Sequence, residues 1–261
     1  KFMEPRDINR NDRFIQYGLI ASKMAVEDAG LSDLTDKEKL RVGVTVGSGI
    51  GGLETIYNGS ITLNEKELES FAVEWRKGYT EFIKDFNLGK KNWKQIDDVH
   101  FSKLIEILKK RNYLKLLEDS QIKEINLLWH KLDPWPDTVE GLDLLKNKFS
   151  IGTLSNGNFS LLLNMSKYSK LNWDFIFSGD IFKKYKTNPL VYKEACDYLD
   201  LDANDVALVA AHENDLLAAK KVGLQTFYVE RENEFEEYKK PSNLSEFDIT
   251  AKSFIDLNSK L

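Results

Sequence analysis

Three short polar segments carry the side chains best suited to chemistry. Residues 155 to 158 read Ser-Asn-Gly-Asn, and the donors of Ser155, Asn156 and the backbone can hold a carboxylate or another oxyanion. Lys186 supplies a fixed positive charge just before a proline-started helix that carries Tyr192. Asp215 stands at the expected start of a helix. Ordinary turn and helix-cap chemistry are the alternatives for the first and third segments, but together the three predict an anion site.

The elements around these segments alternate. Apolar runs typical of strands occupy residues 149–154, 175–177, 206–210 and 226–229, and helical patterns occupy 139–148, 159–169, 189–199 and 215–222. This alternation predicts an α/β fold with a Rossmann-like, doubly wound parallel sheet. Ligands of such sheets bind at the carboxyl ends of the strands, so we expect the three polar segments to converge there.

The preceding part of the chain is patterned differently. Residues 68–86, 93–110 and 122–130 have helical periodicity without a strand signal, which predicts an all-helical module over residues 67–132. Before it we expect a helix at 11–30, a strand at 41–46 and a glycine-rich turn at 47–52. That turn lacks the Lys-Ser/Thr ending of a phosphate loop, so a strand-to-helix turn is favoured over a phosphate cradle.

Composition narrows the class of protein. With 42% hydrophobic residues among 261, the chain can bury a sizeable core, and a net charge of -5 without a basic stripe argues against nucleic acid and membrane partners. The single cysteine, Cys196, cannot form an internal disulfide and is expected to be a packed core thiol. No signal-peptide pattern is present, so a cytoplasmic location is expected; a homodimer is compatible with the sequence.

Two long strings carry a family resemblance. LSNGNFSLLLNMSKYSKLNWDFIFSGDIFKKYKTNPLVYKEA and VALVAAHENDLLAAKKVGLQTFYV are similar in motif, order and spacing to the type II (S)-2-haloacid dehalogenases of the haloacid dehalogenase-like superfamily, over about residues 67–261. The resemblance implies a helical cap at 67–132, an α/β core at 133–261, and a short 2-substituted carboxylate as the small-molecule partner. It also implies a set of site residues. Ser155 and Asn156 would bind the substrate carboxylate, Lys186 would neutralise charge, Tyr192 and Asp215 would complete the pocket, Arg76 would contact halide, and Trp75, Asn158 and His212 would contribute secondarily.

The third polar segment distinguishes metal-dependent phosphatases from dehalogenases within that superfamily. The resemblance implies that phosphatases place a magnesium-binding acid where this chain has Ala211, and Ala211 cannot ligate a hard cation. We therefore expect a metal-free dehalogenase without a cofactor. His212 departs from the asparagine that is more usual in bacterial members, and a buried structural histidine is the alternative.

The aspartate nucleophile of that family is missing. In the resemblance it ends the first core strand in an Asp-x-x-Gly-Thr motif and attacks C2 to give an ester that water hydrolyses. No such motif precedes Trp75. Residues 1–66 instead resemble an internal fragment of an elongating β-ketoacyl-ACP synthase, through NDRFIQYGLIASKMAVEDAG and RVGVTVGSGIGGLETIYNGSITLNEK, without that family's catalytic residues. The strand at 41–46 is expected to take the place of the missing strand, with Thr45 or Ser48 facing the pocket.

Three functions follow as hypotheses. The first is a dehalogenase-like hydrolase of short 2-haloalkanoic acids, impaired by the missing nucleophile. The second is a non-catalytic protein that binds small carboxylates. The third, a condensing-enzyme fragment, depends only on the first quarter of the chain and lacks that family's catalytic residues.

Overall fold

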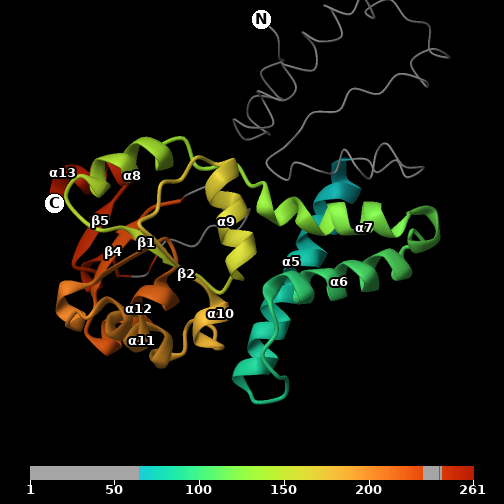
Figure 1. Ribbon diagram of the computed structural model, residues 1–261, viewed down its shortest axis with the longest axis horizontal. Helices are drawn as coiled ribbons and strands as arrows, with labels where there is room; N and C mark the ends of the chain where they lie inside the picture. Colours follow the sequence, from blue (N-terminus) through green and yellow to red (C-terminus); the bar gives the residue numbers. More distant parts are fainter. Residues whose placement is uncertain (1–64, 232–240, 242) are drawn as a thin grey trace, which may run out of the picture.

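The computed structural model describes residues 65–231, 241 and 243–261. The predicted helix at 11–30, strand at 41–46 and glycine-rich turn at 47–52 lie outside these residues. Within them, a helical module and an α/β part follow one another along the chain (Figure 1).

The helical module contains α5 (Glu65–Asn87), α6 (Ile96–Lys110), η1 (Leu114–Leu116), α7 (Asp119–Asn126) and η2 (Leu127–His130). The prediction that this stretch is all-helical is confirmed. α6 begins at Ile96 rather than at residue 93, because Gln95 has extended backbone angles. Asp97 and Asp98 in the first turn favour that start, since carboxylates stabilise helix N-termini.

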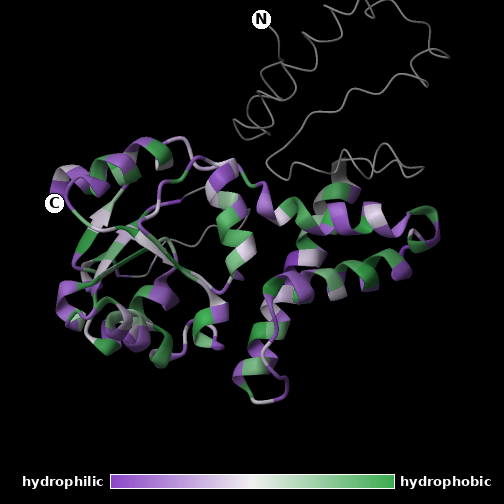
Figure 2. Ribbon diagram, viewed as in Figure 1, coloured by the Kyte–Doolittle hydropathy of each residue, from purple (hydrophilic) through white to green (hydrophobic). Residues whose placement is uncertain are grey.

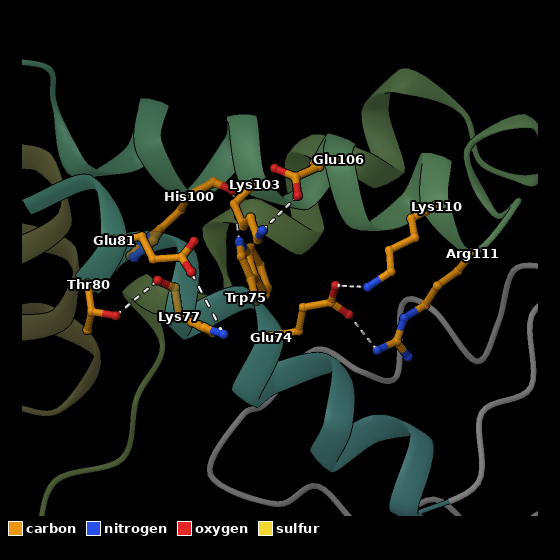
Figure 3. A network of polar contacts seen from close by, with 10 residues as sticks. All are labelled: Glu74, Trp75, Lys77, Thr80, Glu81, His100, Lys103, Glu106, Lys110 and Arg111. Carbon is orange, nitrogen blue, oxygen red and sulfur yellow. Dashed lines mark hydrogen bonds and ion pairs between the residues drawn. The ribbon is translucent and has the colours of Figure 1, made fainter. Parts of the chain in front are cut away.

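Apolar side chains and a polar network join α5 to α6. The core of the module is formed by Phe71, Trp75, Leu104, Ile107, Leu108, Leu117, Ile122, Ile125 and Leu128. Figure 3 shows the carboxylate of Glu74 on α5 paired with Lys110 and Arg111. Nζ of Lys110 donates to Oε1 at 2.6 Å, and Nη2 of Arg111 donates to Oε2 at 3.0 Å. These two bonds hold the pKa of Glu74 below its ordinary value.

The α/β part runs from residue 138 to the C-terminus. Its elements are α8 (Thr138–Lys146), β1 (Gly152–Leu154), α9 (Phe159–Tyr168), β2 (Phe175–Phe177), α10 (Gly179–Phe182), α11 (Pro189–Leu199), η3 (Ala203–Asp205), β3 (Ala207–Ala210), α12 (Glu213–Val222), β4 (Gln225–Val229), η4 (Leu244–Glu246), β5 (Ile249–Ala251) and α13 (Phe254–Lys260). The four strands and four helices predicted for this part are present, although β1 is shorter than the predicted strand at 149–154, and the α/β class is confirmed. The sequence patterns did not predict α10, β5 or α13.

All described strands pair in parallel, but in two groups. β1 pairs with β2, and β3 pairs with β4, which pairs with β5. Figure 2 shows apolar residues (green) on both the strands and the helices around them. β4 is the most buried of the described strands. Its neighbours pack it on both faces, as expected for a parallel strand between helices.

The two parts are joined by a partly buried polar cluster that includes Asn158 and Asn164 at the start of and within α9. In Figure 1, α9 lies between the strands and the helical module. Asn158 donates to Oδ2 of Asp97 at 2.8 Å, and Asn164 donates to Nδ1 of His130 at 3.0 Å. That leaves Nε2–H of His130 to donate to Oδ1 of Asp97, also at 3.0 Å. Burial acts to raise the pKa of Asp97, but the hydrogen bonds from His130 and Asn158, together with the electrostatic effects of His130 and His100, outweigh it and lower that pKa.

Candidate anion-binding site

Lys186, Asp215 and Tyr192 meet at the carboxyl end of β3. The ammonium of Lys186 donates to Oδ2 of Asp215 at 2.5 Å, and the Tyr192 hydroxyl donates to Oδ1 at 2.5 Å. α11 presents Tyr192 because Asn188 caps it by accepting from the Leu190 N–H, with proline in the first turn. Two of the predicted polar segments therefore converge as expected.

Asn156 ties the first polar segment to the other two. Its side-chain oxygen accepts the backbone N–H of Lys186 at 2.6 Å, and its amide nitrogen donates to the Tyr79 hydroxyl at 2.9 Å. Ser155 lies beside it, and its Oγ accepts from the Gly157 N–H at 3.1 Å. A continuous chain of hydrogen bonds thus runs from α5 through Asn156 to Lys186 and Asp215.

The two tyrosines of this hydrogen-bonded network, Tyr79 and Tyr192, are held in the neutral form. Burial, the charge of Asp215 and the hydrogen bond to it raise the pKa of Tyr192. Burial also raises the pKa of Tyr79, although the amide of Asn156 and the charge of Arg76 oppose the shift. Neither phenol is prepared to lose its proton near neutral pH, so both are suited to orient partners rather than to act as bases.

Gly179, at the start of α10, allows the backbone of the first polar segment to pack directly against α10. A Cβ at this position would lie 2.6 Å from the backbone oxygen of Asn156. The Gly179 N–H donates to the oxygen of Gly157 at 2.9 Å. The absence of a side chain therefore sets the position of Asn156, and sequence patterns gave no sign of this role.

The remaining predicted site residues differ in how far their side chains are buried. Arg76 is exposed on α5, and its charge acts to lower the pKa of the Tyr79 hydroxyl against the effect of burial. Trp75 is buried in the core of the module, with its Nε1–H donating to the oxygen of His100 at 2.8 Å (Figure 3). His212 is exposed and precedes α12, so the alternative of a buried structural histidine is wrong.

Two residues depart from the simplest role that the sequence suggested, which was a helix cap for Asp215 and a secondary place in the site for Asn158. α12 begins at Glu213, and the carboxylate of Asp215 bonds Lys186 and Tyr192, so the helix-cap alternative is not what is observed. Asn158 is buried and bonds Asp97, at the junction of the two parts. Cys196 is a buried free thiol in the core, as predicted, and burial raises its pKa.

Tyr79 is the site residue that the sequence interpretation missed. It lies three residues after Arg76, one turn along α5, so both side chains share a helix face. That spacing was the available signal. Within the described part of the chain, no group of three or more His, Cys, Asp or Glu side chains is arranged to hold a metal ion. No helix of that part is long and apolar enough to cross a membrane.

The fold and the site define an α/β protein in which Asn156, Lys186, Tyr192 and Asp215 are joined by hydrogen bonds at the strand ends. The family model for haloacid dehalogenase-like hydrolases matches residues 37–223. The chain belongs to this family. A curated relative, (S)-2-haloacid dehalogenase 4A of Burkholderia cepacia, is 36% identical over 113 residues, covering 42% of this chain and 49% of the relative. The chain spans about half the length of the curated dehalogenases that it matches.

Solved structures agree with this assignment. The L-2-haloacid dehalogenase PA0810 is 32% identical with a TM-score of 0.68, covering 72% of this chain and 82% of that one. The defluorinating L-2-haloacid dehalogenase Rha0230 is 31% identical with a TM-score of 0.74, covering 80% and 85%. The predicted dehalogenase resemblance is confirmed.

A second relationship covers a quarter of the chain. Over 66 residues the chain is 46% identical to 3-oxoacyl-[acyl-carrier-protein] synthase 2 of Vibrio cholerae, which is 25% of this chain and 16% of that enzyme. The predicted resemblance to a condensing enzyme is therefore confirmed as well. Its short coverage fits a fragment.

Proposed function

We propose that the pocket formed by Lys186, Asn156 and Ser155 binds short 2-substituted carboxylates, with the helical module acting as its cap. Support comes from the donors gathered at one edge of the strands and from Arg76 on α5. The printed names of the relatives, 2-haloacid dehalogenases, indicate the same class of substrate. Charge-assisted hydrogen bonds from lysine and arginine suit a carboxylate of this kind.

We further propose that carbon–halide hydrolysis by this chain is severely impaired. The Asp-x-x-Gly-Thr motif that the family uses for covalent attack does not occur in the sequence before the helical module. Asp215 is a poor replacement, because Tyr192 and Lys186 already engage both of its oxygens. A serine or threonine hydroxyl, such as that of Thr45 or Ser48, is a weak nucleophile unless a base activates it.

The main support for the proposal is that hydrogen bonds join Asn156, Lys186, Asp215 and Tyr192 in a sequence that lacks the nucleophile motif. Calorimetric titration with (S)-2-chloropropionate and with lactate tests binding, and a chloride electrode tests turnover. We expect saturable binding and chloride release at least about 10⁴-fold slower than in an active family member. Release at an ordinary rate would refute the impairment.

A matched pair of lysine variants locates the site. Lys186→Met should weaken carboxylate binding about tenfold or more. Lys184→Met, which removes a lysine paired with Glu194 at 3.1 Å, should leave the affinity unchanged. Equal effects of the two variants would place the anion elsewhere.

Binding without any chloride release would favour the second candidate, a non-catalytic carboxylate-binding protein. It rests on the same donors and differs only in lacking turnover. If no carboxylate binds, both functions fail. The cytoplasmic location and the homodimer stay predictions.

A further inference from the structure

Two backbone positions at the entry to α6 are bonded to side chains of the α/β part. The hydroxyl of Tyr185 donates to the oxygen of Lys94 at 2.5 Å and accepts the N–H of the same residue at 3.2 Å. Further along, the N–H of Asp97 donates to Oδ1 of Asn158 at 3.1 Å. These bonds are made to the main chain of the helical module, so they fix the path of the chain into α6 rather than one of its side chains.

Tyr185 is also enclosed by apolar side chains of the helical module. It is fully buried, and the rings of Phe82 and Phe86 on α5 meet its ring edge-on, with centroids 6.1 and 4.8 Å away. Burial raises the pKa of Tyr185 to about 12, so the hydroxyl keeps the proton that it donates. Because both its ring and its hydroxyl are held by the module, the main chain at this position is fixed to the module as well.

The main chain of Tyr185 leads directly into the candidate site. Lys186 follows it, and the Lys186 N–H donates to Oδ1 of Asn156 at 2.6 Å. The Asn188 N–H donates to the oxygen of Tyr185 at 3.0 Å, which closes a turn around Lys186 at the start of α11. Asn158, the other residue that bonds the entry to α6, lies two residues after Asn156. Both ties to the helical module are therefore next to residues of the proposed anion pocket.

We infer that Tyr185 is a positioning residue for Lys186 and transmits the position of the helical module to the anion site. Its role rests on the proposed carboxylate binding, in which Lys186 contacts the anion. The Tyr185 hydroxyl is engaged by Lys94, so it acts on the ammonium only through the main chain that it fixes. A shift of the entry to α6 would displace this turn and, with it, the bonds from Lys186 to Asn156 and Asp215.

Amide hydrogen exchange on the full chain without ligand tests the positioning directly. Tyr185→Phe removes both bonds to Lys94 and keeps the ring between the two phenylalanines of α5. The Lys186 N–H, which donates to Asn156 at 2.6 Å, should then exchange about tenfold faster, because the turn that carries it has lost its tie. Unchanged exchange would overturn the inference.

Ser169→Ala is the matched control. It removes another buried hydroxyl that donates to a backbone oxygen, that of Leu132 at 2.7 Å, at the opposite end of α9 from Asn158. The same kind of bond is lost, but away from the carboxyl ends of the strands, so the exchange of the Lys186 amide should not change. Equal acceleration in the two variants would mean a general loosening of the protein and would also overturn the inference.

Calorimetric titration with lactate tests the effect on binding. We expect Tyr185→Phe to weaken the affinity about fivefold, the typical effect of one hydrogen bond. In the Lys186→Met background the same substitution should have no further effect, because Tyr185 acts through that lysine. An equal loss in both backgrounds contradicts the inference. If no carboxylate binds to the unsubstituted protein, the proposed function fails, whereas the exchange of the Lys186 amide still decides the role of Tyr185.

The unsubstituted protein provides a test that needs no variant. The amides of Lys186 and Asp97 lie on opposite sides of the junction and bond Asn156 and Asn158, respectively. If Tyr185 ties their segments together, both amides should become exposed in one opening event and share one dependence of exchange on denaturant. Separate openings would refute the positioning role, and this comparison decides if Tyr185→Phe does not fold.

Discussion

The ammonium of Lys186 lies 2.5 Å from Oδ2 of Asp215, so the cation of the proposed anion pocket is already neutralised by a carboxylate. Both side chains are largely shielded, at 19% and 12% exposure, which limits screening by water. An incoming carboxylate must therefore compete with Asp215 for the same ammonium. In the proposed site, the strength of this ion pair would limit how tightly an anion binds.

Replacing Asp215 should strengthen anion binding. In Asp215→Asn the amide oxygen can still accept from Tyr192, but the competing negative charge is gone. We expect carboxylate affinity to rise about tenfold, which corresponds to ~1.4 kcal/mol. Calorimetry with lactate measures this, with the exposed Asp205→Asn as the control. A loss of affinity would show that Asp215 helps to hold the ligand.

Removing the Tyr192 hydroxyl should destabilise the protein. Tyr192→Phe leaves Oδ1 of Asp215 without its donor at 2.5 Å in a buried setting. The expected loss in the free energy of unfolding is about 1–3 kcal/mol, measured by urea denaturation. Tyr198→Phe, on the same helix but 63% exposed, should cost little. Similar losses in both variants would contradict the importance of this bond.

Gly179 should not tolerate a methyl group. In Gly179→Ala the Cβ would meet the backbone oxygen of Asn156 at 2.6 Å, forcing the first polar segment to move. We expect a loss of about 1–3 kcal/mol in unfolding free energy together with weaker carboxylate binding. Ser178→Ala is the control, since within the described structure the buried Ser178 hydroxyl has no hydrogen-bond partner. Unaltered binding in Gly179→Ala would show that Asn156 does not need this approach.

His100 should make the protein less stable in mild acid. Burial lowers the pKa of His100 from 6.5 to about 4, so below pH 6.5 the unfolded chain takes up a proton that the folded chain refuses. Stability should therefore fall as the pH drops from 6.5 to 4, by up to about 3 kcal/mol.

The variant His100→Phe isolates this effect. Phenylalanine can keep the stacking on Trp129, where the rings lie 4.6 Å apart, and it takes up no proton. Urea unfolding at pH 7.5, 5.5 and 4.5 should show a shallower loss of stability in the variant. Parallel pH profiles for both proteins would mean that His100 is not the responsible group.

Much of the fold was predictable because its signals are local. The strand at 175–177 and the helix at 189–199 were predicted with their observed bounds, since an apolar β-rich run and an Asn-Pro start act within a few residues. The short elements α10 and β5 were not predicted. They have only four and three residues, which is too few for a helical or strand periodicity to be recognised.

The sequence by itself determined the family, the order of the strands and helices, and the polar segments that carry Ser155, Lys186 and Asp215. Only the tertiary structure decided that Tyr79 reaches Asn156 and that Gly179 sets the position of that residue. These two contacts join residues that are 77 and 23 positions apart, and depend on how packed elements lie in space. The spacing of residues in the sequence predicts which side chains share one face of a helix or strand. It does not predict which faces of different elements pack together.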